Sequence, residues 1–298
     1  MRIGVVVNPV AGGNRGALVG AEVISLLSQS EHALEDLSGK TLAEAKSNIE
    51  KALAGKSVDA VVFVGGDGMA HLGANVCANS QVPIALIAAG TGNDAAAMLG
   101  MPLTNTAESV RLVLAGLGSP KKVDAVKIAH GGTTTWALGS ASAGFDALAA
   151  ARANAISWPK GPMRYYVAML LELAKFKPIR YQSVVDGAPR NFEAMLCIVS
   201  NTGIFGGGML VVPNASVTDG KLDVLLVKKM SRLKFVTIFP KVYKGTHITD
   251  KDVEIFKASK VSIEAAGMPI YSDGEYVGQA PFEAEVVPGA LLMVAPGI

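Results

Sequence analysis

The feature that most constrains the fold of this chain is a set of three short apolar runs in its first third, each followed by a glycine-rich loop. The runs cover residues 3–7, 60–64 and 83–88, and helical patterns separate them at 16–28, 42–54, about 69–77 and 94–99. A short apolar run that stops at turn residues is typical of a strand buried on both faces, and such strands belong to parallel sheets. The sequence therefore predicts an α/β domain with a parallel sheet.

After about residue 123 the pattern changes to many short strand-like runs with turn residues between them. These runs cover residues 133–141, 181–185, 192–199, 222–227, 260–264, 270–271 and 282–287. Turn signals such as Asp186-Gly187 indicate hairpins, so a mainly antiparallel β-sandwich is expected, interrupted by helices at 163–176 and 231–243. A length of 298 residues suits two domains. We expect them at 1–122 and 123–288, with 289–298 a candidate to return to the first.

Composition excludes several classes of protein. Apolar residues make up 50% of the chain and charged residues 17%, which excludes disorder, and the net charge of +2 argues against a nucleic-acid partner. No apolar run approaches the roughly 20 residues that span a bilayer, and no signal peptide is recognisable. Cys77 and Cys197 lack metal or redox spacing and are expected to be buried free thiols. These features predict a cytoplasmic protein whose contact with membranes is peripheral.

The sequence Val64-Gly65-Gly66-Asp67-Gly68 joins an apolar run to a helical pattern. Glycines there let backbone N–H groups approach an anion closely, and the start of a helix adds its positive end. A carboxylate in a phosphate cradle would repel the phosphate unless a divalent cation lay between them, so Asp67 indicates Mg²⁺-nucleotide. The alternative is a tight turn with Asp67 as the helix N-cap.

Two further loops have the same placement. Residues 89–94, with the sequence AGTGND, follow the third apolar run, and residues 8–13, with the sequence NPVAGG, follow the first. Because the carboxyl ends of parallel strands meet at one edge of a sheet, all three loops are expected to face one crevice. Turn chemistry alone does not explain three such loops on one edge.

A fourth signal, Ser272-Asp273-Gly274-Glu275, lies far along the chain. Asp-Gly between alternating residues is a common hairpin turn, and spacing alone favours that interpretation. If the hairpin folds over the nucleotide crevice, Glu275 could accept the proton of a substrate hydroxyl as general base.

Together these motifs resemble the diacylglycerol kinase catalytic-domain family, the soluble bacterial lipid kinases related to sphingosine and ceramide kinases. The similarity extends over most of the chain. Its motifs are the loops at 8–13, 65–68 and 90–94, then Ala143-Gly144-Phe145-Asp146, Gly206-Gly207-Gly208, 219–223 (DGKLD), 244–247 (KGTH) and 273–275 (DGE). The GGDG loop alone is shared with NAD kinases and phosphofructokinases, whereas GTGND with a late DGE is specific.

The resemblance implies an ATP-binding N-terminal domain, a lipid-binding β-sandwich domain and an active site between them. It implies Glu275 as proton acceptor beside Asp273, with Asp67 also in the catalytic set. It implies a structural Mg²⁺ bound by Asp219 and by the carbonyls of Ser216 and Lys221. The residues expected to bind ATP and its Mg²⁺ are Asn8, Pro9, Val10, Ala11, Gly12, Ser38, Gly65, Gly66, Asp67, Gly68, Met69, Ala70, His71, Leu72, Thr91, Gly92, Asn93 and Asp94.

The sequence departs from the family pattern after the GGDG loop. Many relatives have Thr followed by an Asn-Glu pair two residues on, whereas this chain has Met69 and then His71-Leu72. Met69 removes a hydroxyl that could bind phosphate, and Leu72 removes a carboxylate. The departures leave the phosphate geometry and the nucleotide affinity open.

A lipid substrate stays in its bilayer, so a surface that meets the membrane is expected. Residues 228–244 carry six basic side chains and no acidic ones, with apolar residues interleaved. That composition is typical of a helix at an anionic membrane surface, although an ordinary amphipathic helix with solvated lysines fits equally well. For residues 163–176 we expect burial, because apolar residues surround that helix. Homodimerisation is left open.

The sequence thus predicts an ATP-dependent lipid kinase that phosphorylates the hydroxyl of diacylglycerol or a related lipid alcohol. One alternative is an NAD-kinase-like or other small-molecule kinase. The other is a nucleotide- or lipid-binding protein with impaired catalysis, which the departures at Met69 and Leu72 would support.

Overall fold

The computed structural model describes residues 1–158 and 162–298 and divides the chain into two compact units. Unit 1 contains residues 1–123 and 288–298, and unit 2 contains residues 124–287. Strand β18 (Phe282–Met293) belongs to both, because it pairs with β15 in unit 2 and its end pairs with β4 in unit 1. The last residues of the chain therefore complete the N-terminal sheet.

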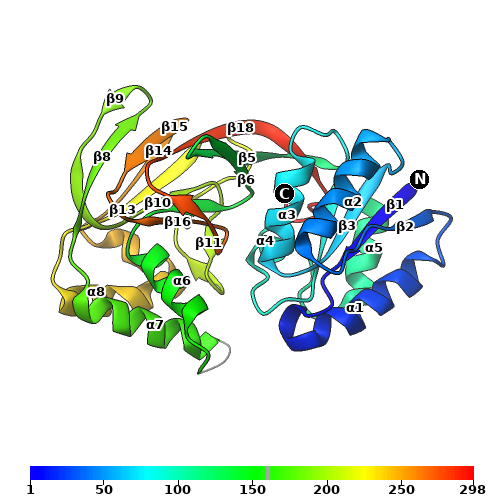
Figure 1. Cartoon of the computed structure of the whole chain (residues 1–298), viewed down its shortest axis with the longest axis horizontal. Helices are drawn as coiled ribbons and strands as arrows, with labels where there is room; N and C mark the ends of the chain where they lie inside the picture. Colours follow the sequence, from blue (N-terminus) through cyan, green and yellow to red (C-terminus); the bar gives the residue numbers. More distant parts are fainter. Residues whose placement is uncertain (159–161) are drawn as a thin grey trace. The chain divides into compact units, whose positions relative to one another are not determined.

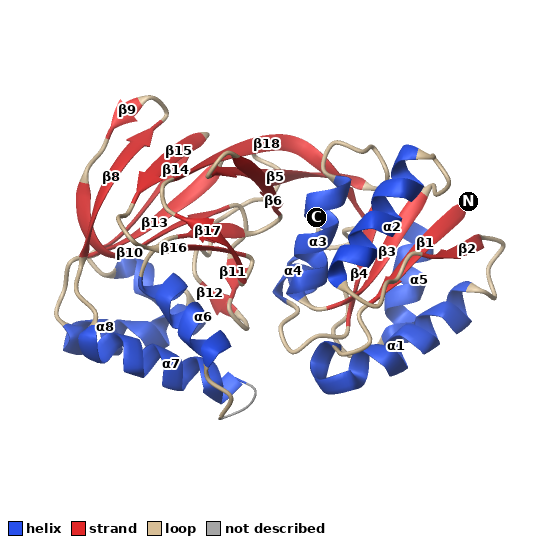
Figure 2. Cartoon of the chain, in the orientation of Figure 1, coloured by secondary structure: helices blue, strands red, loops and turns tan. Residues whose placement is uncertain are grey.

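Unit 1 is built on a parallel sheet with strand order β4-β3-β1-β2, extended by the end of β18 (Figures 1 and 2). Helices α1 and α5 pack together, as do α2 and α3. The strands are β1 (Arg2–Val7), β2 (Ala33–Asp36), β3 (Ala60–Gly65) and β4 (Ile84–Ala88). The helices are α1 (Ala11–Leu27), α2 (Leu42–Ala54), α3 (Asp67–Cys77), α4 (Asp94–Met98) and α5 (Thr106–Gly116).

Strands β3 and β4 are fully buried along their length, as their unbroken apolar sequences predict. The predicted α/β architecture with a parallel sheet is confirmed. Strand β2 was not predicted, because it is only four residues long and half-exposed. Cys77 is buried and unpaired as expected, and burial raises the pKa of its thiol to about 12.

Unit 2 is mainly antiparallel, as predicted. One path of strands runs β17-β16-β7-β10-β8-β15-β18, and β13 joins β10 to β14. The strands are β5 (Lys121–His130), β6 (Thr133–Ala137), β7 (Ser140–Ser142), β8 (Ile179–Val185), β9 (Ala188–Pro189), β10 (Phe192–Ser200), β11 (Ile204–Phe205), β12 (Met209–Leu210), β13 (Leu222–Lys228), β14 (Val253–Ala258), β15 (Lys260–Glu264), β16 (Pro269–Ser272) and β17 (Glu275–Gln279).

Two apolar clusters stabilise unit 2. The first is formed by inward-facing strand residues such as Val126, Cys197, Leu222 and Ile263. The second lies under the helices and contains Phe145, whose ring packs edge-on against neighbouring aromatic rings. The helices are α6 (Phe145–Ala155), α7 (Pro162–Lys175) and α8 (Arg232–Ile238), followed by the 3-10 turns η1 (Phe239–Lys244) and η2 (Thr246–Thr249).

Candidate active site

The three glycine-rich loops of unit 1 begin at one edge of its parallel sheet. The register pairs the last residues of β1, β3 and β4 with one another, Val7 with Val64 and Gly65 with Ala88. Backbone hydrogen bonds continue beyond the strands, from Asn8 N–H to the carbonyl of Val64 at 3.0 Å and from Ala89 N–H to that of Gly65 at 2.8 Å. The loops therefore leave the sheet side by side.

In chain order the first loop covers residues 8–13, the second 65–68 and the third 89–94. The second and third loops pack backbone against backbone. A Cβ added to Gly66 would lie 2.6 Å from the carbonyl oxygen of Gly92, and one added to Gly90 would lie 2.4 Å from the Cα of Gly66. Asp67 N–H also donates to the Gly92 carbonyl at 3.3 Å. Glycine is thus required here for loop packing as well as for any approach of phosphate.

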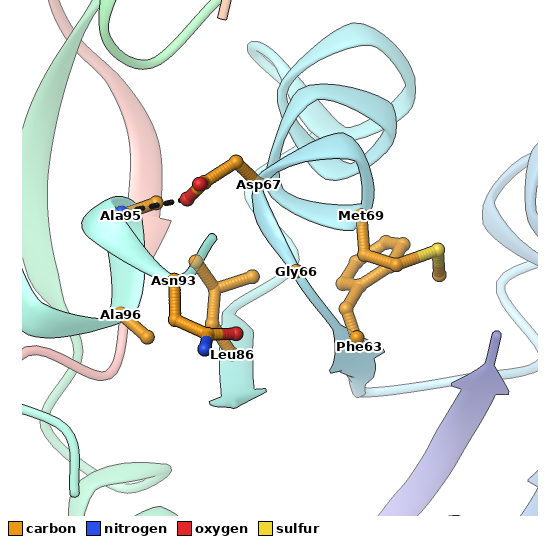
Figure 3. Close-up of a pocket in the computed structure, with 9 residues that line it drawn as sticks. Phe63, Gly66, Asp67, Met69, Leu86, Asn93, Ala95 and Ala96 are labelled. Atoms are coloured by element: carbon orange, nitrogen blue, oxygen red, sulfur yellow. Dashed lines mark hydrogen bonds between the residues drawn. The ribbon is translucent and has the colours of Figure 1, made fainter. Parts of the chain in front are cut away.

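Asp67 is the first residue of α3 and connects the two loops through its side chain (Figure 3). Its Oδ1 accepts a hydrogen bond from Ala95 N–H at 3.0 Å, within the first turn of α4. The N-cap of α3 is Gly66, so the alternative role of Asp67 as N-cap is wrong. Asp94 begins α4, which brings a second carboxylate to the same pair of loops. Two carboxylates at these loops fit a hard divalent cation associated with phosphate.

Asn93 shapes the third loop from within. Its side-chain amide donates to the carbonyl of Gly90 at 3.0 Å, and its Oδ1 accepts from Gly90 N–H at 2.9 Å. Its side chain lines a small pocket beside Gly66 and Asp67 (Figure 3). Thr91, at the tip of the loop, is exposed. The side chain of Thr91 is therefore accessible to a ligand, and Asn93 maintains the loop's shape.

The departures Met69 and Leu72 have their side chains in the protein interior. Both are 5% exposed, and Ala70 is 4% exposed. The Met69 Cγ fills the space beside Gly65, where an added Cβ would lie 2.3 Å away. These side chains support the loop from behind, so a contact with nucleotide at positions 69, 70 and 72 is open only to backbone atoms.

The first loop has an unusual backbone. Gly12, Gly13 and Asn14 have φ values of 57°, 69° and 78°, which interrupt the start of α1. A Cβ on Gly12 would lie 2.4 Å from the carbonyl oxygen of Ala89, so this loop contacts the third. Val10 is 69% exposed and projects from the loop.

Ser38, expected to contact nucleotide, has its hydroxyl engaged elsewhere. Its Oγ accepts a hydrogen bond from Val7 N–H at 2.9 Å, and its carbonyl accepts one from the side chain of Asn48. It fixes the end of β1 and so supports the first loop indirectly. Its contact with ATP remains a prediction.

Sequence reasoning missed Arg15, which follows the first loop. One guanidinium nitrogen donates to the carbonyls of Ala88 and Leu103, both at 3.1 Å. This places a cation at the end of β4, next to the start of the third loop. Arginine is well suited to bind phosphate oxygens. The signal available in the sequence was a lone cation immediately after a glycine-rich loop.

In unit 2 the predicted DGE segment is a hairpin turn that joins β16 to β17. Ser272 pairs with Glu275, and Asp273 and Gly274 have φ values of 49° and 85°, as in a two-residue loop. The hairpin interpretation of this segment is therefore confirmed. Glu275, the first residue of β17, is exposed.

Asp273 anchors this hairpin. Its Oδ1 accepts hydrogen bonds from the backbone N–H groups of Gly139 at 3.0 Å and Ser140 at 2.9 Å, and its Oδ2 accepts one from Leu138 at 3.1 Å. These three bonds occupy the carboxylate, so Asp273 positions the turn that carries Glu275. Its predicted place in the catalytic set stays a prediction.

The predicted structural Mg²⁺ site centres on Asp219. Its Oδ1 accepts a hydrogen bond from Lys221 N–H at 3.0 Å, and its Oδ2 pairs with Lys257 Nζ at 2.7 Å. The same ammonium contacts Asp223 at 3.1 Å, and although burial lowers the pKa of Lys257, the two hydrogen bonds raise it. The positive charge beside Asp219 in this structure is thus the ammonium of Lys257. The site, including the carbonyl of Ser216, stays a prediction.

Fold and motifs together define a two-unit lipid kinase, and comparison with known proteins places the chain in a family. Residues 2–128 match the diacylglycerol kinase catalytic domain, and residues 139–295 match the YegS C-terminal NAD kinase beta sandwich-like domain. The chain belongs to this diacylglycerol kinase family.

Curated relatives and a solved structure support this family assignment. The chain is 34% identical over 291 residues to a protein named diacylglycerol kinase from Mycobacterium tuberculosis (strain ATCC 25618 / H37Rv), covering 97% of this chain and 93% of that one. It is 27% identical over 252 residues to a diacylglycerol kinase of Bacillus subtilis (strain 168), covering 82% and 80%. A putative diacylglycerol kinase from Bacillus anthracis superposes with a TM-score of 0.79 at 24% identity, over 99% and 97% of the chains, and shows the same fold.

Proposed function

We propose that this protein transfers the γ-phosphate of ATP to the hydroxyl of diacylglycerol or a related lipid alcohol at a membrane surface, with Glu275 as general base. The observation that carries the proposal is the assembly of three glycine-rich loops with Asp67 and Asp94 at one sheet edge. The relative from M. tuberculosis that shares 34% of its residues with this chain is named a diacylglycerol kinase, which supports the lipid class.

The loops of unit 1 would bind the nucleotide. Their backbone N–H groups and the start of α3 favour phosphate oxygens, and the Arg15 guanidinium adds positive charge beside them. Asp67 and Asp94 would bind Mg²⁺, which screens phosphate charge when present. Because these loops are fixed by their mutual packing, binding requires little rearrangement of the chain, and that favours an aligned phosphate.

Glu275 would supply the proton acceptor. In the proposed step the lipid hydroxyl oxygen bonds to the γ-phosphorus, the bond from that phosphorus to the leaving ADP oxygen breaks, and the hydroxyl proton passes to the Glu275 carboxylate. Glu275 is preferred over Asp273 because the carboxylate of Asp273 already accepts three backbone hydrogen bonds. The proposal requires Glu275 of unit 2 to contact the hydroxyl of the same lipid that receives phosphate from the ATP bound by unit 1.

Burial of Met69 and Leu72 weakens the alternative of a protein with impaired catalysis. Those side chains belong to the interior, so their identity does not remove a group from the ligand side of the loop. The alternative of an NAD-kinase-like enzyme has one observation in its favour, because the C-terminal match is to a domain described as NAD kinase beta sandwich-like. Comparing NAD and sugars with lipid alcohols as phosphate acceptors distinguishes it.

The test is a kinase assay on Glu275→Gln. The variant should bind ATP with unchanged affinity, while kcat on diacylglycerol in mixed micelles falls about 10²–10⁴-fold, the usual contribution of a general base. Glu264→Gln, at the exposed end of β15, is the matched control and should leave kcat unchanged. Turnover of Glu275→Gln near that of the unmodified protein would exclude Glu275 as base, and transfer to NAD with none to lipid would exclude the lipid class.

A further inference from the structure

Two neighbouring helices in unit 2 expose large apolar side chains to solvent. On α8, Leu233 is 82% exposed and Val236 is 45% exposed. On α7, Met163, Leu170 and Leu171 are 59%, 56% and 49% exposed. The expectation that the helix at 163–176 would be buried is therefore wrong for one of its sides. We refer to these five residues as the docking face.

The exposed residues of α7 form one stripe. Positions 163, 170 and 171 are separated by seven and eight residues, which places them on the same side of a helix. The opposite side, represented by Met169 and Leu173, is buried in the apolar cluster of unit 2. The helix is therefore apolar on both sides while only one side contacts the protein. A helix of this kind in a soluble domain usually has its second side covered by another apolar partner.

Helices α7 and α8 are connected by contacts at several points (Figure 1). At one end the Arg232 guanidinium donates to the carbonyl of Phe176, with nitrogen–oxygen distances of 3.1 and 3.3 Å. Further along, the hydroxyls of Tyr166 and Tyr243 lie 2.6 Å apart. Beneath both helices, Phe145 contacts the rings of Phe176 and Phe235 with centroids 5.1 and 5.0 Å away.

Positive charge accompanies the docking face. Residues 228–246 contain no acidic residue, and in residues 162–178 the single one is Glu172, which is buried and paired with Arg152 and Lys175. Lys228, Lys229 and Lys234 are neutralised by neighbouring carboxylates. In the part of the chain that the structure describes, Lys177, Lys241 and Lys244 have no carboxylate within ion-pair distance.

We propose that the docking face is the surface by which this protein binds the headgroup region of an anionic lipid bilayer. Exposed apolar side chains on α7 and α8, with lysines in the adjoining segments 177 and 241–244, have the composition that such an interface favours, in which acyl chains meet apolar groups and anionic headgroups meet basic ones. No described helix is long and apolar enough to cross a membrane. The inference rests on the proposed lipid substrate, which an enzyme has to reach in its bilayer.

Vesicle binding tests the inference without using the kinase reaction. The full chain, without ATP, is sedimented with vesicles of phosphatidylcholine containing phosphatidylglycerol. The double variant Leu170→Gln/Leu233→Gln should bind at least about tenfold more weakly, because two side chains lose their apolar contact with the acyl region. Leu42→Gln is the matched control, since Leu42 is 64% exposed on α2 in unit 1 and should have no effect. Unfolding temperatures check that each variant is folded.

Charge variants test the anionic partner. Lys241→Gln/Lys244→Gln should weaken binding to phosphatidylglycerol vesicles by about fivefold per lysine, because each basic side chain near such a surface contributes about a factor of that size. Binding to pure phosphatidylcholine should be unaffected. Equal loss on both kinds of vesicle would overturn the electrostatic part of the inference.

A second readout keeps this inference separate from the proposed function. Phosphorylation of short-chain dioctanoylglycerol in detergent micelles should be retained in Leu170→Gln/Leu233→Gln, since docking to a bilayer is not needed there. Unchanged vesicle binding by that variant would overturn the docking face while the kinase proposal stands. Vesicle binding through this face by a protein that phosphorylates no lipid would leave docking in place and remove the kinase proposal. A dimer in analytical ultracentrifugation that the variant abolishes would assign the face to a second copy of the chain.

Discussion

Asp146 is a buried carboxylate that should destabilise unit 2 at neutral pH. It is the second residue of α6, after the N-cap Gly144. Its Oδ1 atom is enclosed and has no hydrogen-bond partner in the described part of the chain. Burial raises the pKa of this carboxyl from 3.8 to about 6, against the opposing effects of a hydrogen bond from Ser142 and of backbone N–H groups.

The sign of the effect follows from proton linkage. A carboxyl whose pKa is higher in the folded protein binds a proton more readily there than in the unfolded chain, so its stabilising effect is complete below pH 3.8 and is lost as the pH rises through 6. A shift from 3.8 to about 6 corresponds to about 3 kcal/mol of unfolding free energy, at about 1.36 kcal/mol per unit. Part of the residue is accessible to solvent, so this figure is an upper limit.

Asp146→Asn removes the titration and changes the shape of the side chain little. Between pH 4 and 7.5 the unmodified protein should lose up to about 2.5 kcal/mol more unfolding free energy than the variant does. Comparing the two pH values cancels any constant cost of placing an amide there. Urea unfolding followed by tryptophan fluorescence is a suitable assay, because both tryptophans, Trp136 and Trp158, lie in unit 2 and report on its unfolding.

The reasoning has a clear refutation. If the difference in unfolding free energy between Asp146→Asn and the unmodified protein is the same at pH 4 and pH 7.5, Asp146 does not titrate with a raised pKa. Glu264→Gln is the control for the pH series, because Glu264 is an exposed carboxylate at the end of β15 in the same unit.

Three further predictions follow from contacts at the site. Gly90→Ala should weaken ATP binding and lower the unfolding temperature of unit 1, because the added Cβ would lie 2.4 Å from the Cα of Gly66. Calorimetric titration with ATP measures the affinity, and thermal unfolding measures the stability. Asp273→Asn should destabilise unit 2 by about 2 kcal/mol and reduce kcat with ATP affinity unchanged, since charge-assisted bonds to backbone N–H groups are weakened. Asp219→Ala should lower the unfolding temperature through loss of the ion pair with Lys257. If EDTA lowers the unfolding temperature of the unmodified protein, Asp219 also holds the predicted Mg²⁺, and an unchanged unfolding temperature in EDTA would count against that site.

The features that could be predicted from the sequence are those set by local pattern. The strands β1, β3 and β4 are short apolar runs, and a run buried on both faces has few alternatives to a parallel sheet. The position of the loops follows, because parallel strands end at the same edge. The hairpin at Asp186-Gly187 could also be predicted, because Asp-Gly favours such a turn, and both residues adopt the positive φ that it requires.

Features that depend on distant partners could not be predicted in this way. Asp273 accepts hydrogen bonds from residues more than a hundred positions earlier, and nothing beside it in the sequence indicates them. The inward orientation of Met69 and Leu72 depends on which side of α3 faces the sheet. The exposed side of α7 was misassigned because its apolar residues occur on nearly all sides of the helix, and its one acidic residue, Glu172, lies on the buried side.

The packing of the glycine-rich loops bears on whether nucleotide binding, proposed for unit 1, can be separated from proton transfer, proposed for unit 2. Gly66 and Gly90 contact each other through backbone atoms, and Gly12 contacts the carbonyl of Ala89, so the three glycine-rich loops are held together by the protein itself. A site that is arranged in advance loses little conformational entropy on binding. Every one of these contacts lies within unit 1, whereas Glu275 and its anchor Asp273 lie in unit 2. Nucleotide affinity should therefore depend on the loops alone, and Glu275→Gln should separate ATP binding from phosphate transfer.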